Sequence, residues 1–104
     1  MRMMQRRFSY ELPEAGQTLT LHGELDEAGS AELRDLLRAI TADLVGELRI
    51  DLVDVDFLPS VAVGVLAAAQ GAAAKKGASI TFVAAKGSIA QRVLTICGLS
   101  HEEA

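Results

Sequence analysis

The stretch from residue 56 to residue 66, DFLPSVAVGVL, places a proline and one hydroxyl, that of Ser60, between two apolar segments. Before it, residues 47–53 (ELRIDLV) alternate apolar and polar side chains, a period of two that predicts a strand with one buried face. After it, residues 61–76 are rich in alanine and end in two lysines followed by Gly77, which are helix stop signals. The stretch therefore marks a direct transition from a strand to a helix.

The same two periodicities predict the other elements. Apolar residues recur at helical offsets over 31–44, which predicts a helix with one buried face and a charged face toward water. Ser88 and Gln91 have the spacing of a capping box, and they open a last helix that stops at Gly98. The remaining predicted strands cover residues 8–12, 17–25 and 78–85, with a break at Pro13 and a turn at 14–16 after the first.

The resulting order, β-β-α-β-α-β-α, is typical of an α/β fold. Strands that alternate with helices pair in parallel through right-handed crossovers, so we expect a small mixed sheet of four to five strands flanked by helices. A length of 104 residues suits a single domain over 1–104. In such folds, binding sites collect where strands end and helices begin.

Composition excludes several functional classes. The formal charge of −4 argues against nucleic acid or an anionic membrane as a partner, because both favour clustered cations. No apolar run is long enough to insert into a membrane, and no apolar segment follows the basic residues 1–7 as a signal peptide requires. A single cysteine, Cys97, fits a reducing cytoplasm, and its place among apolar residues predicts a buried, inert thiol.

Signatures of catalysis are scarce, so we expect no enzymatic activity and no cofactor. The sequence has neither a glycine-rich phosphate loop nor paired cysteines. His22, Glu24 and Asp26 alternate along one strand face; they are interpreted as solvated residues, with Asp26 leading into the helix, rather than as a metal site. His101 and residues 102–103 are interpreted as a solvated chain end.

Four segments, in order, resemble the STAS domain family of bacterial anti-sigma factor antagonists. They are GELD at 23–26, DLVDVDFL at 51–58, VGVL at 63–66, and RVL with CGL at 92–94 and 97–99. The resemblance spans the chain from about the second strand to residue 99, and it implies a STAS-like fold and a protein-binding switch. The implied partner is an anti-sigma factor or a related serine kinase-type regulator.

The resemblance also implies where such a switch is controlled. Family members are phosphorylated at the start of the helix that follows the third strand, where the second of two adjacent hydroxyl residues is the acceptor. In this chain that position is Val61, and the preceding acidic position is Pro59. Ser60 matches only the first hydroxyl residue. The implied antagonist is therefore one without the usual phosphorylation control.

Two roles remain open for Ser60. As a helix N-cap it would accept a hydrogen bond from an amide two or three residues on, and this is the role we expect. The alternative is a displaced phosphorylation site. The expected partner-binding residues lie at strand-to-helix junctions: Asp26, Asp56, Ser60, Val61 and Gly64.

A second functional hypothesis comes from a different class of protein. STAS-type domains also serve as accessory subunits that dock on the ATPase of a membrane lipid transport complex without being phosphorylated. The missing hydroxyl at Val61 suits that role as well. Homodimer formation is compatible with either hypothesis.

Overall fold

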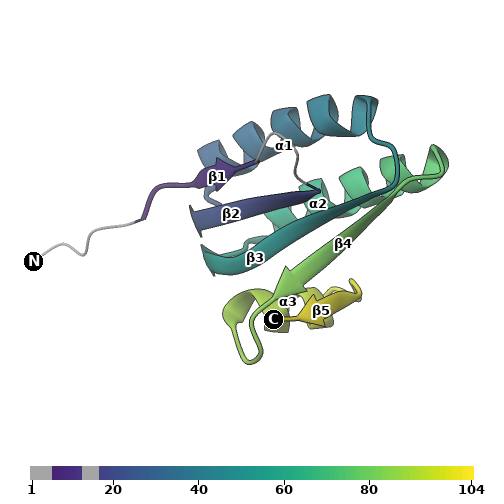
Figure 1. The fold of residues 1–104 in the computed structure, drawn as a ribbon. Helices are drawn as coiled ribbons and strands as arrows, with labels where there is room; N and C mark the ends of the chain where they lie inside the picture. The colour runs from purple at the N-terminus through teal and green to yellow at the C-terminus, as the bar shows by residue number, and fades with distance from the viewer. Residues whose placement is uncertain (1–5, 13–16) are drawn as a thin grey trace, which may run out of the picture.

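A mixed five-stranded sheet, in the order β1-β2-β3-β4-β5, forms the centre of the computed structural model, which describes residues 6–12 and 17–104 (Figure 1). The predicted break at Pro13, the turn at 14–16 and the first five residues of the basic N-terminal segment lie outside the described residues. In chain order the elements are β1 (Ser9–Glu11), β2 (Thr18–Glu24), α1 (Glu27–Ala42), β3 (Glu47–Phe57), α2 (Ser60–Lys75), β4 (Ser79–Ala84), α3 (Ile89–Ile96) and β5 (His101–Glu103).

Strand pairing follows the expected mixed pattern. β1 runs antiparallel to β2, and every other neighbouring pair of strands is parallel. Leu19, Ile50 and Phe82 lie side by side on three adjacent strands and are fully buried. They form the centre of the core because alternate strand residues point to the same face of a sheet.

The helices contribute their apolar faces to this same core. α1 and α2 run side by side along the sheet (Figure 1), and Leu33 and Leu66 from these helices are fully buried. α3 contacts β3 and β5, and its Leu94 joins the same cluster of buried side chains. Among the described residues, none of the helices is both long enough and apolar enough to cross a bilayer.

β3 continues past residue 53, where the predicted strand ended, because its pairing with β2 shifts register at two places. Such bulges leave a backbone group without a ladder partner, and the Asp51 carboxylate accepts a hydrogen bond of 2.9 Å from the Val53 N–H there. Buried positions then fall at Leu52, Val55 and Leu58, three residues apart instead of two. The period-two pattern of the sequence therefore could not predict residues 54–57 of this strand.

The N-terminal segment packs closely against the end of β2. The Glu24 N–H donates a hydrogen bond of 3.0 Å to the Arg6 carbonyl oxygen. Gly23 has a φ of +85°, and a Cβ at this position would collide with the carbonyl oxygen of Arg7. Only glycine suits this position, because it accepts a positive φ and lets another backbone approach.

The structure corrects the predicted start of α1 and the predicted burial of Cys97, and it adds a strand near the end of the chain. α1 begins at Glu27, four residues before the predicted start at 31, because Asp26 caps it. Residues 102–103 are exposed, as expected of a solvated end, but they also form β5, which pairs with β4. Cys97 is exposed at the end of α3, since the helix turns its buried face through Ala90 and Leu94 instead.

Candidate functional site

The ends of β2, β3 and β4 and the starts of α1, α2 and α3 lie along one edge of the sheet, because the three strands are parallel (Figure 1). We call this region the helix-start edge; it includes Asp26, Asp56, Phe57, Ser60, Val61 and Ile89. The Leu25 N–H donates a hydrogen bond of 3.1 Å to the Phe57 carbonyl oxygen, which joins the first two junctions directly. The structure thus places Asp26 and Asp56 at the ends of two neighbouring strands, as their positions in the sequence predicted.

The start of α1 is closed by its own side chain. The Asp26 carboxylate accepts a hydrogen bond of 2.8 Å from the Gly29 N–H. This satisfies one of the free amide groups of the first turn and places a negative charge at the positive end of the helix dipole. The prediction that Asp26 leads into the helix is confirmed.

The start of α2 is different, and the expected N-cap role of Ser60 is wrong. Pro59 occupies the N-cap position with extended backbone angles, and it provides no side-chain hydrogen bond. The Val63 N–H donates to the Pro59 carbonyl oxygen at 3.1 Å, so the helix begins one residue earlier than expected. Ser60 is the first helical residue, and its exposed hydroxyl has no hydrogen-bond partner among the described residues.

Apolar side chains gather at the same edge. Val61 is 53% exposed at the start of α2, Phe57 is 48% exposed at the end of β3, and Ile89 is 58% exposed at the start of α3. Val63, by contrast, is buried in the core. Large apolar residues are also exposed elsewhere on the domain, such as Val45 and Ile96, so what distinguishes these three is their position at the starts of α2 and α3 and at the end of β3.

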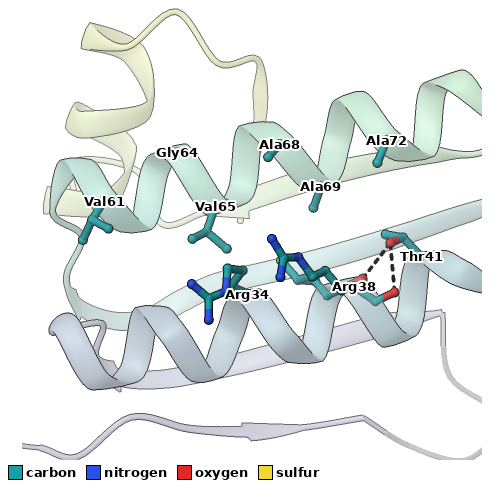
Figure 2. Close-up of a pocket in the computed structure, with 10 residues that line it drawn as sticks. Arg34, Arg38, Thr41, Val61, Gly64, Val65, Ala68, Ala69 and Ala72 are labelled. Atoms are coloured by element: carbon teal, nitrogen blue, oxygen red, sulfur yellow. Dashed lines mark hydrogen bonds between the residues drawn. The ribbon is translucent and has the colours of Figure 1, made fainter.

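Gly64 lies one turn further along α2 and is exposed. It lines a groove between α1 and α2 that has a volume of about 510 Å³ (Figure 2). We call this the α1–α2 groove; it is lined by Arg34, Leu37, Arg38, Thr41, Val61, Gly64, Val65, Ala68, Ala69 and Ala72. Val61 belongs to both the helix-start edge and the groove, so the two surfaces are continuous.

Asp56 takes part in a network of charged side chains, which we call the His22 cluster: Arg6, Glu11, His22, Asp54 and Asp56. The Arg6 guanidinium donates to Asp56 at 2.8 Å and to Asp54 at 2.6 Å. The two ring nitrogens of His22 lie 2.6 Å from carboxylate oxygens of Asp54 and Glu11. The cluster therefore links the N-terminal segment to β1, β2 and β3.

The cluster shifts the ionisation of its central members. The hydrogen bond from Arg6, followed by that from His22, lowers the pKa of Asp54 to about 2. The hydrogen bonds to Asp54 and then to Glu11 raise the pKa of His22 above 6.5. Both shifts favour the charged forms, because each charge faces its opposite.

The polar residues that the sequence predicted to lie on one strand face have separate contacts. His22 faces Asp54 and Glu11, whereas Asp26 caps α1. Within residues 6–12 and 17–104, no three His, Cys, Asp or Glu side chains are grouped as a metal site would require. His101 is half-buried, with its Nδ1 atom 3.1 Å from the Leu99 carbonyl oxygen.

Sequence reasoning missed parts of this region. Phe57 and Ile89 were not among the predicted partner-binding residues. The sequence placed Phe57 only in a strand-to-helix transition and Ile89 only in the last predicted helix. The pairing of His22 with Asp54 depends on the shifted register of β2 and β3, which no local pattern announces. The only available signal was the density of charged residues among 51–56.

Comparisons with known proteins identify a matching family and similar relatives. The family model described as "Mlab, STAS domain" matches residues 8–101. The anti-sigma-F factor antagonist RsfB of Mycobacterium tuberculosis is 38% identical over 82 residues, which cover 78% of this chain and 65% of that protein.

Two solved structures have a similar fold. An anti-sigma factor antagonist from Mycobacterium paratuberculosis gives a TM-score of 0.77 at 24% identity, with 94% of this chain and 86% of that chain covered. The anti-sigma factor antagonist SpoIIAA in its unphosphorylated form gives 0.69 at 18% identity, with 89% and 82% covered.

Proposed function

This chain belongs to the STAS domain family, and we propose that it works there as an anti-sigma factor antagonist that binds an anti-sigma factor or a serine kinase-type regulator. The similarity to RsfB supports the class of partner, since that protein is named for antagonism of an anti-sigma factor. The matched residues span 65% of the length of RsfB, so the activity of the whole relative is carried over here only as part of this proposal.

The helix-start edge is the proposed binding surface, with contacts from Asp26, Asp56, Ser60 and Val61, and from Gly64 one turn further along α2. The observation that carries this proposal is the exposed apolar side chain of Val61 at the start of α2, where the N-cap Pro59 provides no side-chain hydrogen bond. Burying such a side chain against a partner removes apolar surface from water, which favours association. Phe57 and Ile89 extend the apolar surface, and Asp56 adds charge beside it.

The proposed antagonist acts by binding and not by catalysis, and it lacks the usual phosphorylation control. Val61 occupies the family's acceptor position and has no hydroxyl. Ser60 has an exposed hydroxyl one residue away, but neighbouring helical residues point in directions about 100° apart, so a kinase aimed at position 61 would not meet it. In-line phosphoryl transfer tolerates little misplacement of the attacking oxygen.

Binding to purified anti-sigma factors from the same genome tests the proposal. Isothermal titration should show a stoichiometric complex with one of them, and the addition of this chain to an anti-sigma–sigma complex should release the sigma factor. Binding without release of any sigma factor would contradict the antagonist function. Binding to a transporter ATPase, with no binding to anti-sigma factors, would assign the chain to the accessory-subunit class instead.

A further inference from the structure

The α1–α2 groove has two chemically different walls (Figure 2). The α2 wall is made of small and aliphatic residues, and the α1 wall presents two arginine side chains that reach toward α2. Leu37 and Ala69 are buried at its floor. The groove thus combines an apolar floor with a cationic rim.

The α2 wall has the spacing that a docked helix needs. Gly64, Ala68 and Ala72 are four residues apart and exposed. Residues at this spacing form one row along a helix, and rows of small side chains leave a shallow channel into which the ridge of another helix packs. Over Val61 to Ala72, at 1.5 Å per residue, the wall is about 16 Å long, or roughly three helical turns.

The fold itself gives no reason for the glycine in this row. A Cβ at Gly64 would meet nothing within 4 Å, and its φ lies outside the positive region. Glycine is less favourable than alanine inside a helix, so alanine would stabilise the free protein at this position. Glycine here leaves room for a second backbone to approach closely, although Gly71 of the same helix has equally open surroundings and does not line the groove.

The α1 wall supplies charge complementarity for an anionic partner. Arg34 and Arg38 lie one turn apart and are exposed. Arg34 makes only a 3.3 Å contact with its neighbour Asp35, and Arg38 makes no ion pair with any residue in the described part of the chain. In a chain whose formal charge is −4, these two guanidinium groups form a local cationic rim beside an apolar floor.

We propose that the α1–α2 groove binds an acidic amphipathic helix of a partner protein. The apolar face of that helix packs on the alanine row, and two carboxylates one turn apart pair with Arg34 and Arg38. A small ligand is disfavoured, because such ligands need most of their surface enclosed and six of the lining residues are exposed: Arg34, Arg38, Val61, Gly64, Ala68 and Ala72. The proposal extends the proposed function, since the groove begins at Val61 on the helix-start edge.

Synthetic peptides test the groove without knowledge of the partner. The probe is a helical peptide of about 16 residues with a leucine and alanine stripe and two glutamates one turn apart beside it. The matched control peptide has lysines in place of the two glutamates. Addition of the glutamate peptide to the ¹⁵N-labelled chain of 104 residues should shift the amide signals of Arg34, Arg38, Gly64 and Ala68. The glutamate peptide should bind on the order of tenfold more tightly than the lysine peptide.

Matched variants separate the groove from the rest of α2. Ala68→Leu fills the groove and should weaken binding of the glutamate peptide on the order of tenfold, because the ridge can no longer enter. Ala74→Leu makes the same change at an exposed alanine of α2 that does not line the groove, and it should leave the affinity unchanged. Arg34→Gln with Arg38→Gln should abolish the preference for glutamate over lysine, whereas Arg92→Gln on α3 should preserve it.

Equal affinity for the two peptides, no binding of either, or equal effects of Ala68→Leu and Ala74→Leu would overturn the proposal. Binding of dodecanoate in the groove without binding of the glutamate peptide would also overturn it and assign the groove to small amphipathic anions. Each of these results leaves the proposed function standing, because that function is tested separately with purified anti-sigma factors.

Discussion

The starts of α1 and α3 differ from the start of α2 in how their first amide groups are satisfied. Asp26 accepts from the Gly29 N–H at 2.8 Å, and Ser88 accepts from the Gln91 N–H at 3.0 Å. At α2 the N-cap is Pro59, which provides no side-chain hydrogen bond, and Ser60 is exposed. Two helix starts therefore have a side-chain N-cap, whereas the N-cap residue of the third provides none; we call the start of α2 open in this sense.

The difference shows what holds α2 in place. Its first turn buries Ala62 and Val63, and Leu66 follows in the core. Burial of apolar side chains, rather than a cap, therefore fixes this helix start. A junction that needs no side-chain cap is free to present Ser60 and Val61 to a partner, which is the role that we propose for it.

The largest expected effect is on phosphorylation. When incubated with a partner kinase and ATP, the wild-type protein should incorporate little or no phosphate, because Val61, at the proposed acceptor position, has no hydroxyl. The double change Pro59→Asp with Val61→Ser should produce labelling, and Val61→Ser alone should do so in part. Incorporation of radiolabelled phosphate from ATP measures the extent of phosphorylation in the wild type and the variants. Mass spectrometry then locates the phosphorylated residue.

Stoichiometric labelling of the wild type at Ser60, abolished in Ser60→Ala, would reverse this conclusion. It would mean that the exposed hydroxyl of the uncapped helix start is the switch. The comparison between the three helix starts would then separate a regulated junction from two structural ones.

A smaller effect is expected on stability. Ser88→Ala removes the α3 cap and should cost about 1 kcal/mol of the free energy of unfolding. Ser60→Ala removes an exposed hydroxyl without a described partner, so its effect should stay within about 0.5 kcal/mol. Urea denaturation of the two matched variants measures the difference, and equal losses would show that Ser60 does cap α2 in solution.

The smallest expected effect concerns the His22 cluster beside the helix-start edge. The pKa of His22 is raised above 6.5, so its contribution to stability is complete below pH 6.5 and disappears as the pH rises through its folded pKa. The pKa of Asp54 is lowered from 3.8 to about 2, so its contribution is complete above 3.8 and disappears as the pH falls toward 2. The stabilising contributions of His22 and Asp54 are therefore both present between about pH 4 and pH 6.5.

NMR titration of the ring signals of His22 tests this cluster. The wild-type pKa should exceed 6.5, and Asp54→Asn should bring it down because the first of its two carboxylate partners is lost. A wild-type pKa at or below 6.5 would mean that the contacts of 2.6 Å do not persist in solution.

Local patterns predicted most of the fold and fewer features of the site. The Ser88 cap and the role of Asp26 depend on residues within a few positions of each other, so their spacing was sufficient. β5 was missed because its three residues are short and polar, and they become a strand only by pairing with β4. Long-range pairing of this kind has no local signature.

The errors at Ser60 and Cys97 have a related cause. A serine before an apolar run is a common N-cap, but here the backbone of Pro59 takes that place and shifts the helix by one residue. The apolar residues near Cys97 suggested burial, although the helix ends at Ile96 and turns the thiol outward. In both cases the side chain is of a type that suits the predicted role. Its orientation, however, depends on the residue at which the helix begins or ends.

The central claim, that the open start of α2 binds the partner, is tested most directly by a pair of valine substitutions. Val61 is 53% exposed at the helix-start edge, and Val45 is 85% exposed before β3, at the opposite edge of the sheet. Isothermal titration with an anti-sigma factor that binds the wild type would compare Val61→Lys with Val45→Lys. We expect Val61→Lys to weaken binding by about tenfold or more, since a charge at a buried contact costs more than 1.4 kcal/mol, and Val45→Lys to bind like the wild type. Equal affinities for the two variants, or a larger loss at Val45, would contradict the claim.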